Sequence, residues 1–367
     1  MVCLLSVSAS GQGTTPADAI ALERQGKLTE AANAWRAVTA EDPTDASAFA
    51  SLGVVLSKQQ DYSQAASAYR KALALNPKLP GVQLNLGLAE FKQGRFEEAI
   101  APLHAALAAD PHNLQASTLL GLSYYGAKRF AEASDALQVA AESDPANAEL
   151  HEVLAQSCLW AKKYSCALTE FKQILQHDPD SASAHMLSGE ALDGLRRTPE
   201  AIAEFEAAAK VSPREPNVHF GLGYLYWESH QYEDAEREFR NELANDPNHP
   251  QALAYLGDIA MKKANLDDAL SLLERAVSLK NDLRLAYVDL GAVFTRRKQY
   301  KEAVAALQRA VQLDSTQPDA HYRLGRIYQA MGNNAESQKE FAKVRELHET
   351  EDSLASKMSA APPPLPP

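Results

Sequence analysis

The feature that most limits how this chain can fold is a motif that returns every 34 residues. Glycine and alanine keep that period through most of the chain, and proline keeps it at Pro43, Pro77, Pro111, Pro145, Pro179, Pro213 and Pro247. A constant period of this length indicates a row of similar structural units. Each unit is too small to bury an apolar face alone, so neighbouring units must stack.

Within one unit the apolar residues have helical spacing. Leu52 and Leu56 form one stripe, while Ala65, Tyr69 and Ala72 form a second, and a polar stretch around Asp61 separates the two. Steps of three and four residues place these side chains on one face of a helix. Proline cannot continue a helix, so the periodic prolines should stop the second one. Each unit is therefore predicted to be a helix, a tight turn and a second helix.

The periodic glycines require a packing reason, because glycine inside a helix costs roughly 1 kcal/mol relative to alanine. We expect the glycine of the first helix to face the alanine of the second, so that Gly87 would touch Ala99 and the two helices could cross closely. Large aromatic residues should then fill the space around this contact, and the sequence offers Tyr62, Phe96, Phe130, Tyr164, Tyr232 and Tyr300.

These residues resemble the tetratricopeptide repeat family, whose pattern is matched by Leu222, Gly223, Tyr226, Ala235, Phe239 and Pro247. The resemblance implies an all-α fold, a right-handed α-solenoid superhelix of helix-turn-helix repeats with a concave inner face. It covers residues 12–351 as ten repeats: 12–45, 46–79, 80–113, 114–147, 148–181, 182–215, 216–249, 250–283, 284–317 and 318–351. Three residues depart from the pattern. Glu90 and Ser188 occupy slots that are usually apolar, and Pro102 should weaken or bend the third repeat.

The two ends of the chain differ from the repeats. Residues 1–11 read MVCLLSVSASG, and we interpret them as the remnant of an export signal whose start lies upstream, or else as a disordered terminus. Residues 352–367 are expected to be a proline-rich disordered tail, with a docking peptide as the alternative. The first interpretation favours a periplasmic or secreted bacterial protein, and a cytoplasmic location is the alternative.

Composition excludes several classes of function. The net charge is -12 and no basic stripe occurs, which argues against nucleic acid as a partner. No apolar run approaches the roughly 20 residues of a membrane span. Phosphate-binding, metalloprotease, hydrolase and dinucleotide motifs are missing, so we expect no catalytic residue, no cofactor and no metal site.

Two sets of residues could still suggest chemistry. His151, His185 and His219 share one repeat position, but equivalent residues of stacked helices lie about 8 to 10 Å apart, too far to share one metal ion. We interpret them as structural residues at repeat junctions. Cys158 and Cys166 lie on the two helices of one repeat, where a disulfide is possible in an oxidising compartment and two free thiols are the alternative.

The family resemblance implies that the first helix of each repeat lines the concave face. Carried over to this chain, it indicates a peptide-binding surface with two apolar patches and acidic residues between them: Leu84, Leu88, Phe91, Leu122 and Tyr125, then Glu190 and Asp193, then Phe220, Tyr224, Trp227 and Met261. Large apolar side chains at such positions usually contact a partner. The alternative is that they only pack against one another. The acidic middle, which also includes Glu152, should face basic residues of a bound segment.

The sequence thus favours a non-enzymatic scaffold that binds a partner peptide or helix in its concave groove. The alternative is a targeting or regulatory subunit of a multiprotein enzyme or secretion assembly, for example one associated with a glycosyltransferase, with catalysis on another chain. Two known specialisations of the family do not fit. The paired Lys and Asn of a carboxylate clamp are missing, and the row from Ser51 to Arg323 that would hold an asparagine ladder contains only Asn85.

Overall fold

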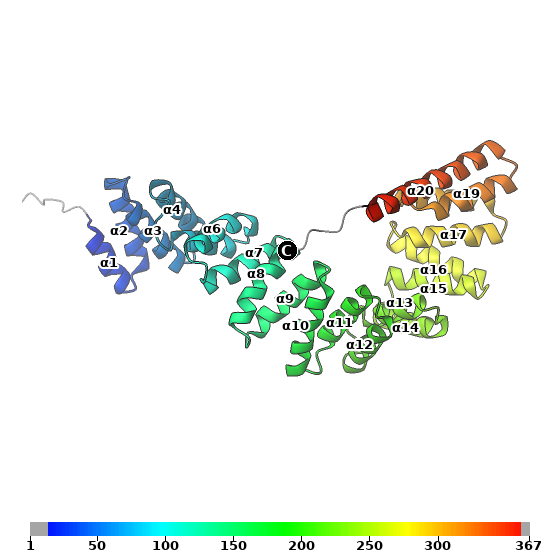
Figure 1. The fold of residues 1–367 in the computed structure, drawn as a ribbon, viewed down its shortest axis with the longest axis horizontal. Coiled ribbons are helices and arrows are strands. Elements are labelled where there is room, and N and C mark those ends of the chain that lie inside the picture. The colour runs from blue at the N-terminus through cyan, green and yellow to red at the C-terminus, as the bar shows by residue number, and fades with distance from the viewer. Residues whose placement is uncertain (1–13, 361–367) are drawn as a thin grey trace, which may run out of the picture. The chain divides into compact units, whose positions relative to one another are not determined.

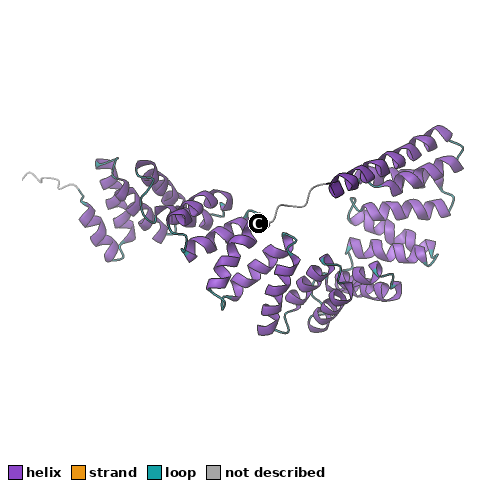
Figure 2. Ribbon diagram, in the orientation of Figure 1, coloured by secondary structure: helices purple, strands orange, loops and turns teal. Residues whose placement is uncertain are grey.

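The computed structural model describes residues 14–360, with side chains up to residue 349. Twenty helices follow one another in antiparallel pairs, and no strand occurs among the described residues (Figure 1, Figure 2). The helices of the first five pairs are α1 (Pro16–Arg24), α2 (Leu28–Glu41), α3 (Ala46–Lys58), α4 (Tyr62–Leu75), α5 (Val82–Lys92), α6 (Phe96–Ala109), α7 (Leu114–Gly126), α8 (Phe130–Ser143), α9 (Ala148–Trp160) and α10 (Tyr164–His177).

The remaining five pairs repeat this arrangement. They are α11 (Ala182–Gly194), α12 (Thr198–Val211), α13 (Val218–Glu228), α14 (Tyr232–Asn245), α15 (Pro250–Lys262), α16 (Leu266–Leu279), α17 (Arg284–Arg296), α18 (Tyr300–Leu313), α19 (Pro318–Ala330) and α20 (Asn334–Ala360). The all-α solenoid of helix pairs is therefore confirmed. Among the described residues, 14–179 and 190–195 form a first compact unit, and 180–189 and 196–360 form a second.

The turn inside each pair uses one backbone conformation at one repeat position. That residue has a positive φ in all ten pairs, between 59° and 80°. It is glycine in only three pairs, at Gly26, Gly94 and Gly332, and the other seven carry a side chain there, such as Ala264 or Lys298. Side chains disfavour the left-handed region by roughly 1–2 kcal/mol, so the packing of the two helices must hold these turns in place.

The ends of the second helices agree with the proline pattern. In all seven pairs with a periodic proline, the second helix ends two residues before it, as α4 does at Leu75 before Pro77. Pro102 is buried inside α6, and that helix continues through it from Phe96 to Ala109. The last helix, α20, runs to Ala360, nine residues past the expected end of the repeats at 351, so the start of the expected tail is helical. Residues 1–13 and 361–367 lie outside the described part of the chain. The predicted export-signal remnant and the last residues of the predicted proline-rich tail fall there.

The periodic glycines pack most closely against a larger side chain than the expected alanine. A Cβ atom added to Gly87 would lie 2.6 Å from Leu103 Cδ2, so its nearest neighbour is the side chain four residues after Ala99. The equivalent alanine lies close by in two other repeats, with Ala201 O 3.3 Å from a Cβ at Gly189 and Ala269 O 3.5 Å from one at Gly257. The contact of Gly87 with Ala99 stays a prediction. The packing of glycine against a large side chain recurs at Gly53 with Tyr69, Gly121 with Leu137, Gly223 with Phe239, Gly257 with Leu273 and Gly291 with Leu307. In this fold the glycine makes room for a large core residue on the second helix of its own pair.

Glu90, the charged residue in a usually apolar slot, is fully buried but neutralised. Its carboxylate pairs with the guanidinium of Arg70 from α4, and Arg95 Nη1 lies 3.7 Å from Glu90 Oε2. A buried carboxylate needs such partners, because removal from water otherwise costs several kcal/mol. The two arginines, which the repeat pattern does not predict, allow the third repeat to carry this residue.

The repeated histidines are structural: each binds a glutamate of its own pair, and His219 also contacts the loop that joins its pair to the preceding one. Nδ1 lies 2.6 Å from Glu170 Oε2 in His151, 2.6 Å from Glu204 Oε2 in His185 and 2.8 Å from Glu238 Oε2 in His219. A fourth such contact joins His321 to Glu340. Each glutamate lies on the second helix of the same pair, so these contacts tie the two helices together. No group of metal-ligating side chains gathers among the described residues.

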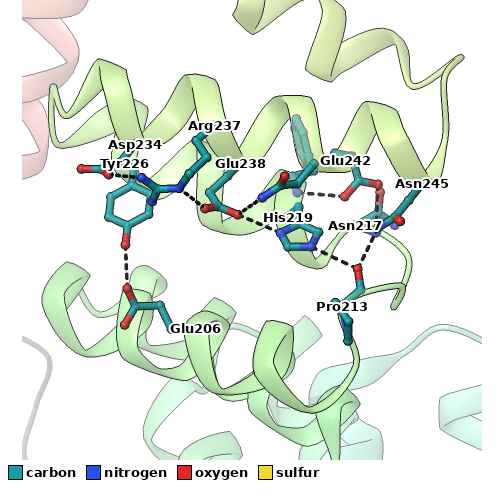
Figure 3. Close-up of polar contacts among 12 residues, drawn as sticks. Glu206, Pro213, Asn217, His219, Tyr226, Asp234, Arg237, Glu238, Glu242 and Asn245 are labelled. Atoms are coloured by element: carbon teal, nitrogen blue, oxygen red, sulfur yellow. Dashed lines mark hydrogen bonds and ion pairs between the residues drawn. The ribbon is translucent and has the colours of Figure 1, made fainter.

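The contacts around His219 show how the helices α13 and α14 are held together (Figure 3). Its Nε2 lies 3.0 Å from the carbonyl oxygen of Pro213, in the loop before α13. The α13 N-terminus has no side-chain cap of its own, and buried Glu242 of α14 instead accepts the backbone N–H groups of Asn217 and Phe220, at 3.3 and 3.0 Å. Exposed N–H groups at a helix start need an acceptor, so Glu242 attaches α13 to α14.

Within residues 14–360, none of the helices combines the length and the apolar character that a membrane crossing requires.

Candidate peptide-binding faces

The first helices of successive pairs form one layer in each unit. In the first unit α3, α5, α7 and α9 touch in succession, and in the second unit α15, α17 and α19 do so. Second helices contact the first helices before and after them, with no comparable contact between one second helix and the next in the described chain. Because the first helices lie closer together, each unit curves with them on its inner side. We call the solvent-facing side of the first helices the inner face.

The inner face of the first unit carries the first apolar patch. Leu84, Leu88 and Phe91 lie on α5, Leu122 and Tyr125 lie on α7, and all five are half-buried. Leu88 also lines a hollow of about 290 Å³ between α3 and α5. Phe91 packs edge-on against Phe96, with ring centroids 5.6 Å apart. The structure thus brings these residues onto two touching helices with part of each side chain open to solvent.

Trp160 at the end of α9 extends this patch and was not among the predicted binding residues. Its indole stacks on Tyr125 with centroids 5.6 Å apart and lies 4.8 Å from the Phe130 ring, yet 47% of the residue remains exposed. The Tyr125 hydroxyl donates to Gln156 Oε1 at 2.5 Å, which fixes the stack. The signal that could have found Trp160 is its repeat position, which is otherwise occupied by glycine, alanine or charged residues.

The second apolar patch is largely an aromatic cluster that packs on itself. Tyr255 of α15 lies at its centre, with ring centroids 4.9 Å from Trp227, 5.8 Å from Tyr224, 6.0 Å from Phe220 and 5.3 Å from Phe239. Phe220, Tyr224 and Trp227 are half-buried. Tyr255 belongs to the row from Ser51 to Arg323, which was considered only as an asparagine ladder, so its role was not predicted.

Met261 does not belong to an open surface. It is 7% exposed and packs in the core of the second unit. Its assignment to the binding surface is therefore unsupported by the geometry. The reason is that α17 touches α15 directly, which covers a side chain that sequence spacing alone places on the inner face.

Polar contacts fix the edge of the aromatic cluster. Trp227 Nε1 donates to Asp258 Oδ2 at 2.6 Å. The Asp258 carboxylate also pairs with Lys262, whose Nζ lies 5.4 Å from the centroid of the Trp227 ring and 5.5 Å from that of the Tyr232 ring. An ammonium group held by a carboxylate and two ring faces is well stabilised. Asp258 is therefore already satisfied within the protein.

The predicted acidic residues lie on α11. Glu190 is exposed and Asp193 is half-buried. Desolvation by surrounding protein atoms raises the pKa of the Glu190 carboxyl, even though the residue keeps contact with solvent. A side chain on a curved inner face has protein atoms close to it and still contacts solvent, as Glu190 does.

Asp289 of α17 is a further acidic residue of the inner layer. It is 4% exposed, and its Oδ2 has no hydrogen-bond partner in the described structure. Burial, together with repulsion from Asp258, raises the pKa of Asp289 to about 8, while Lys262 and Arg323 oppose this change. At neutral pH the carboxyl therefore keeps its proton in the folded chain.

Replacement of Asp289 by asparagine should change how the stability of the second unit depends on pH. An acid whose pKa is raised on folding favours the folded state while protonated, and this advantage is lost as the pH rises from the unfolded value of 3.8 to about 8. The variant should match the wild type at pH 4 and exceed it by several kcal/mol above pH 8, since each pKa unit corresponds to about 1.4 kcal/mol. Urea unfolding at several pH values measures this, with Glu302→Gln on the exposed side of α18 as control. Parallel pH profiles for wild type and Asp289→Asn would contradict the argument.

The two cysteines of the fifth pair are joined in the structure. Cys158 of α9 and Cys166 of α10 form a disulfide, with Cα atoms 5.8 Å apart. Cys166 therefore points toward α9, although it precedes Ala167, the fully buried packing alanine of this pair.

Comparison with known proteins agrees with this architecture. A family model described as "Tetratricopeptide repeat" matches residues 17–80, 161–217 and 220–283, more than half of the chain. Two other models with that description match residues 90–157 and 318–347, and one described as "TPR repeat" matches 293–332. No curated protein sequence matches the chain.

Several solved structures are similar. A chain of the APC/C hetero-tetramer Cut9–Hcn1 has 16% identity and a TM-score of 0.53, with 90% of this chain and 80% of that chain covered. The MamA structure has 22% identity and a TM-score of 0.40 over 45% of this chain and 96% of its own. YrrB, described as a TPR protein with an unusual peptide-binding site, has 20% identity and a TM-score of 0.41 over 51% of this chain and 97% of its own. The first of these shows a shared fold, and with the matching models it establishes that this chain belongs to the tetratricopeptide repeat family.

Proposed function

We propose that this chain is a non-enzymatic scaffold that binds an extended or helical segment of a partner protein on its inner face. The observation that carries the proposal is the stack of Trp160 on Tyr125, which leaves 47% of a tryptophan exposed on a well-packed helix. Aromatic side chains that stay exposed on a concave surface are typical of contact sites, since their burial by a partner releases water.

The two apolar patches do not support binding equally. In the second unit the rings of Tyr224, Trp227 and Tyr255 largely satisfy one another, and Met261 is buried. In the first unit Leu88 lines the hollow between α3 and α5, and Tyr125 and Trp160 offer apolar surface on α7 and α9. We therefore assign the main anchoring site to the first unit and a secondary role to the half-buried edges of Tyr224 and Trp227.

Loss of the Trp160 indole should weaken binding of any peptide that uses this site. The partner is unidentified, so the probe is a random dodecapeptide phage library panned on the immobilised full chain, with the enriched peptides then synthesised. Trp160→Ala should weaken their affinity roughly tenfold or more, because hot-spot aromatic residues contribute about 2 kcal/mol or more.

The matched control for this substitution is Val139→Ala. Val139 is 56% exposed on α8, a second helix, so its replacement should leave the affinity unchanged. Circular dichroism verifies that both variants fold. Peptides that bind Trp160→Ala as tightly as the wild type would refute the assignment to this patch.

We also propose that the protein is exported, to the periplasm or beyond, with the cytoplasm as the alternative. What supports this is the disulfide between Cys158 and Cys166, because such bonds persist in oxidising compartments. Protein purified without reductant from an oxidising compartment should resist alkylation at both residues in peptide mass spectrometry and react at both after reduction. Quantitative alkylation before reduction would contradict the proposal.

A further inference from the structure

The exact repeat of this chain allows one site to serve as a template for another. In the second unit the carboxylate of Asp258 is paired with Lys262, and the ammonium group lies over the rings of Trp227 and Tyr232. We call these four residues the template site. Residues 68 positions earlier, two repeats back, are Glu190, Gly194, Leu159 and Tyr164. All four of these lie in the first unit. Of the first-helix positions equivalent to Asp258, only residue 190 is also acidic.

The earlier site keeps the carboxylate and the tyrosine but lacks the cation. Where Asp258 pairs with Lys262, Glu190 has glycine at the position of that lysine, and no hydrogen bond or ion pair of Glu190 occurs among the described residues. A Cβ atom added to Gly194 would lie 2.6 Å from Tyr164 Cε1, so the tyrosine ring covers the glycine. The ring that lies 5.5 Å from the ammonium in the template is therefore also present here.

The charge around Glu190 favours a cation from outside the chain. The helices α9 and α11 contain Glu149, Glu152, Glu190 and Asp193 but no lysine or arginine. Desolvation already raises the pKa of Glu190, with no cation acting in the opposite direction. Opposite charge would relieve this penalty and form a charge-assisted hydrogen bond.

We propose that Glu190, Gly194 and Tyr164 form a socket for one basic side chain, lysine or arginine, of the bound segment. This inference rests on the proposed function and sharpens it, since it names the chemistry that the partner must present in addition to the group that contacts the Trp160 and Tyr125 stack. The incoming cation takes the place that Lys262 fills in the second unit. Because Gly194 has no side chain, this chain supplies no cation there, and the Tyr164 ring packs directly against the glycine.

The socket can be tested without a partner. Gly194→Lys should place an ammonium beside Glu190, as Lys262 lies beside Asp258, and should lower the pKa of the Glu190 carboxyl, followed by NMR on carboxyl-labelled glutamate. Gly194→Ala is the matched control, because it adds the same Cβ beside Tyr164 but no charge. Other repeats carry a side chain at the position of Gly194 together with a tyrosine at the position of Tyr164. These pairs are Lys92 with Tyr62 and Ala330 with Tyr300. An unchanged Glu190 pKa in Gly194→Lys would overturn the proposal.

The second test uses the library peptides. Those that bind should carry a lysine or arginine whose replacement by glutamine weakens affinity for the wild type roughly tenfold and has little effect on Glu190→Gln, the signature of a coupled pair. Gly194→Lys should weaken the same peptides by a similar factor, while Val139→Ala, which lies on a second helix outside the site, should bind them normally.

The outcomes separate this inference from the proposed function. If peptides require Trp160 but their basic residues show no coupling to Glu190, the socket is wrong and the scaffold proposal stands. If no peptide is enriched, or none requires the inner face, both are wrong.

Discussion

Replacing Phe239 with alanine should lower the free energy of unfolding of the second unit by about 3–5 kcal/mol, the usual cost of removing a fully buried ring. Phe239 is 0% exposed, and its ring stacks on Tyr255 with centroids 5.3 Å apart and interplanar angle 10°. It also occupies the space above Gly223. The cavity would lie between α13, α14 and α15, so the loss should appear in urea unfolding and in faster amide exchange of these helices.

A second phenylalanine provides the control for this variant. Phe91→Ala removes the same ring from a half-buried site on α5 and should cost clearly less. Because each pair of a solenoid contacts only its neighbours, exchange in α3 to α8 should not change in Phe239→Ala. Equal losses for the two variants would show that the aromatic cluster of the second unit adds no stability beyond simple burial.

Replacing Gly121 with valine should destabilise the first unit by about 3 kcal/mol, because overpacking in a close-packed core forces neighbouring groups to move. A Cβ atom at this position would lie 2.5 Å from Leu137 Cγ and 3.2 Å from the Leu137 backbone nitrogen. Leu137 is 0% exposed, so it has no free space into which it could move. Urea unfolding, with amide exchange of α7 and α8, measures the change.

A double variant that exchanges the small and the large residue tests whether contact between residues 121 and 137 causes this loss of stability. Leu137→Ala alone should cost about 2–5 kcal/mol through its cavity. Valine at 121 fills part of that cavity, so Gly121→Val with Leu137→Ala should be more stable than the sum of the two single losses predicts. Strict additivity would mean that the two residues do not interact, and the account of the periodic glycines would be wrong.

Much of this architecture could be predicted from the sequence alone. The periodic prolines, such as Pro77, indicate where second helices end, because proline blocks helix continuation locally. The family pattern around Gly223 and Phe239 predicts the helix pairs. The glycines and alanines that recur at fixed repeat positions predict that the two helices of a pair cross closely. The large residue nearest the glycine was not predicted. Periodicity shows which residues share a face, but it cannot show that the Leu103 side chain comes closest to Gly87.

The candidate site was predicted less completely, for a related reason. Sequence spacing correctly placed Tyr125 and Trp227 on first helices, but it could not show that Tyr255 covers Trp227 or that Met261 is buried. Those facts depend on the distance between adjacent first helices, which repeat spacing does not encode. Trp160 and Asp289 were missed because a side chain's exposure and its unsatisfied atoms are properties of the packed structure.

By itself the sequence determined the repeat, the helix pairs and the family, since all three follow from local preferences repeated at a constant period. Only the tertiary structure decided which glycine accommodates which core residue, that Arg70 and Arg95 neutralise Glu90, and that Lys262 satisfies Asp258 while Glu190 has no such partner. The physical reason is that these contacts join residues of neighbouring helices, where a shift of a few ångströms separates an ion pair from an exposed charge.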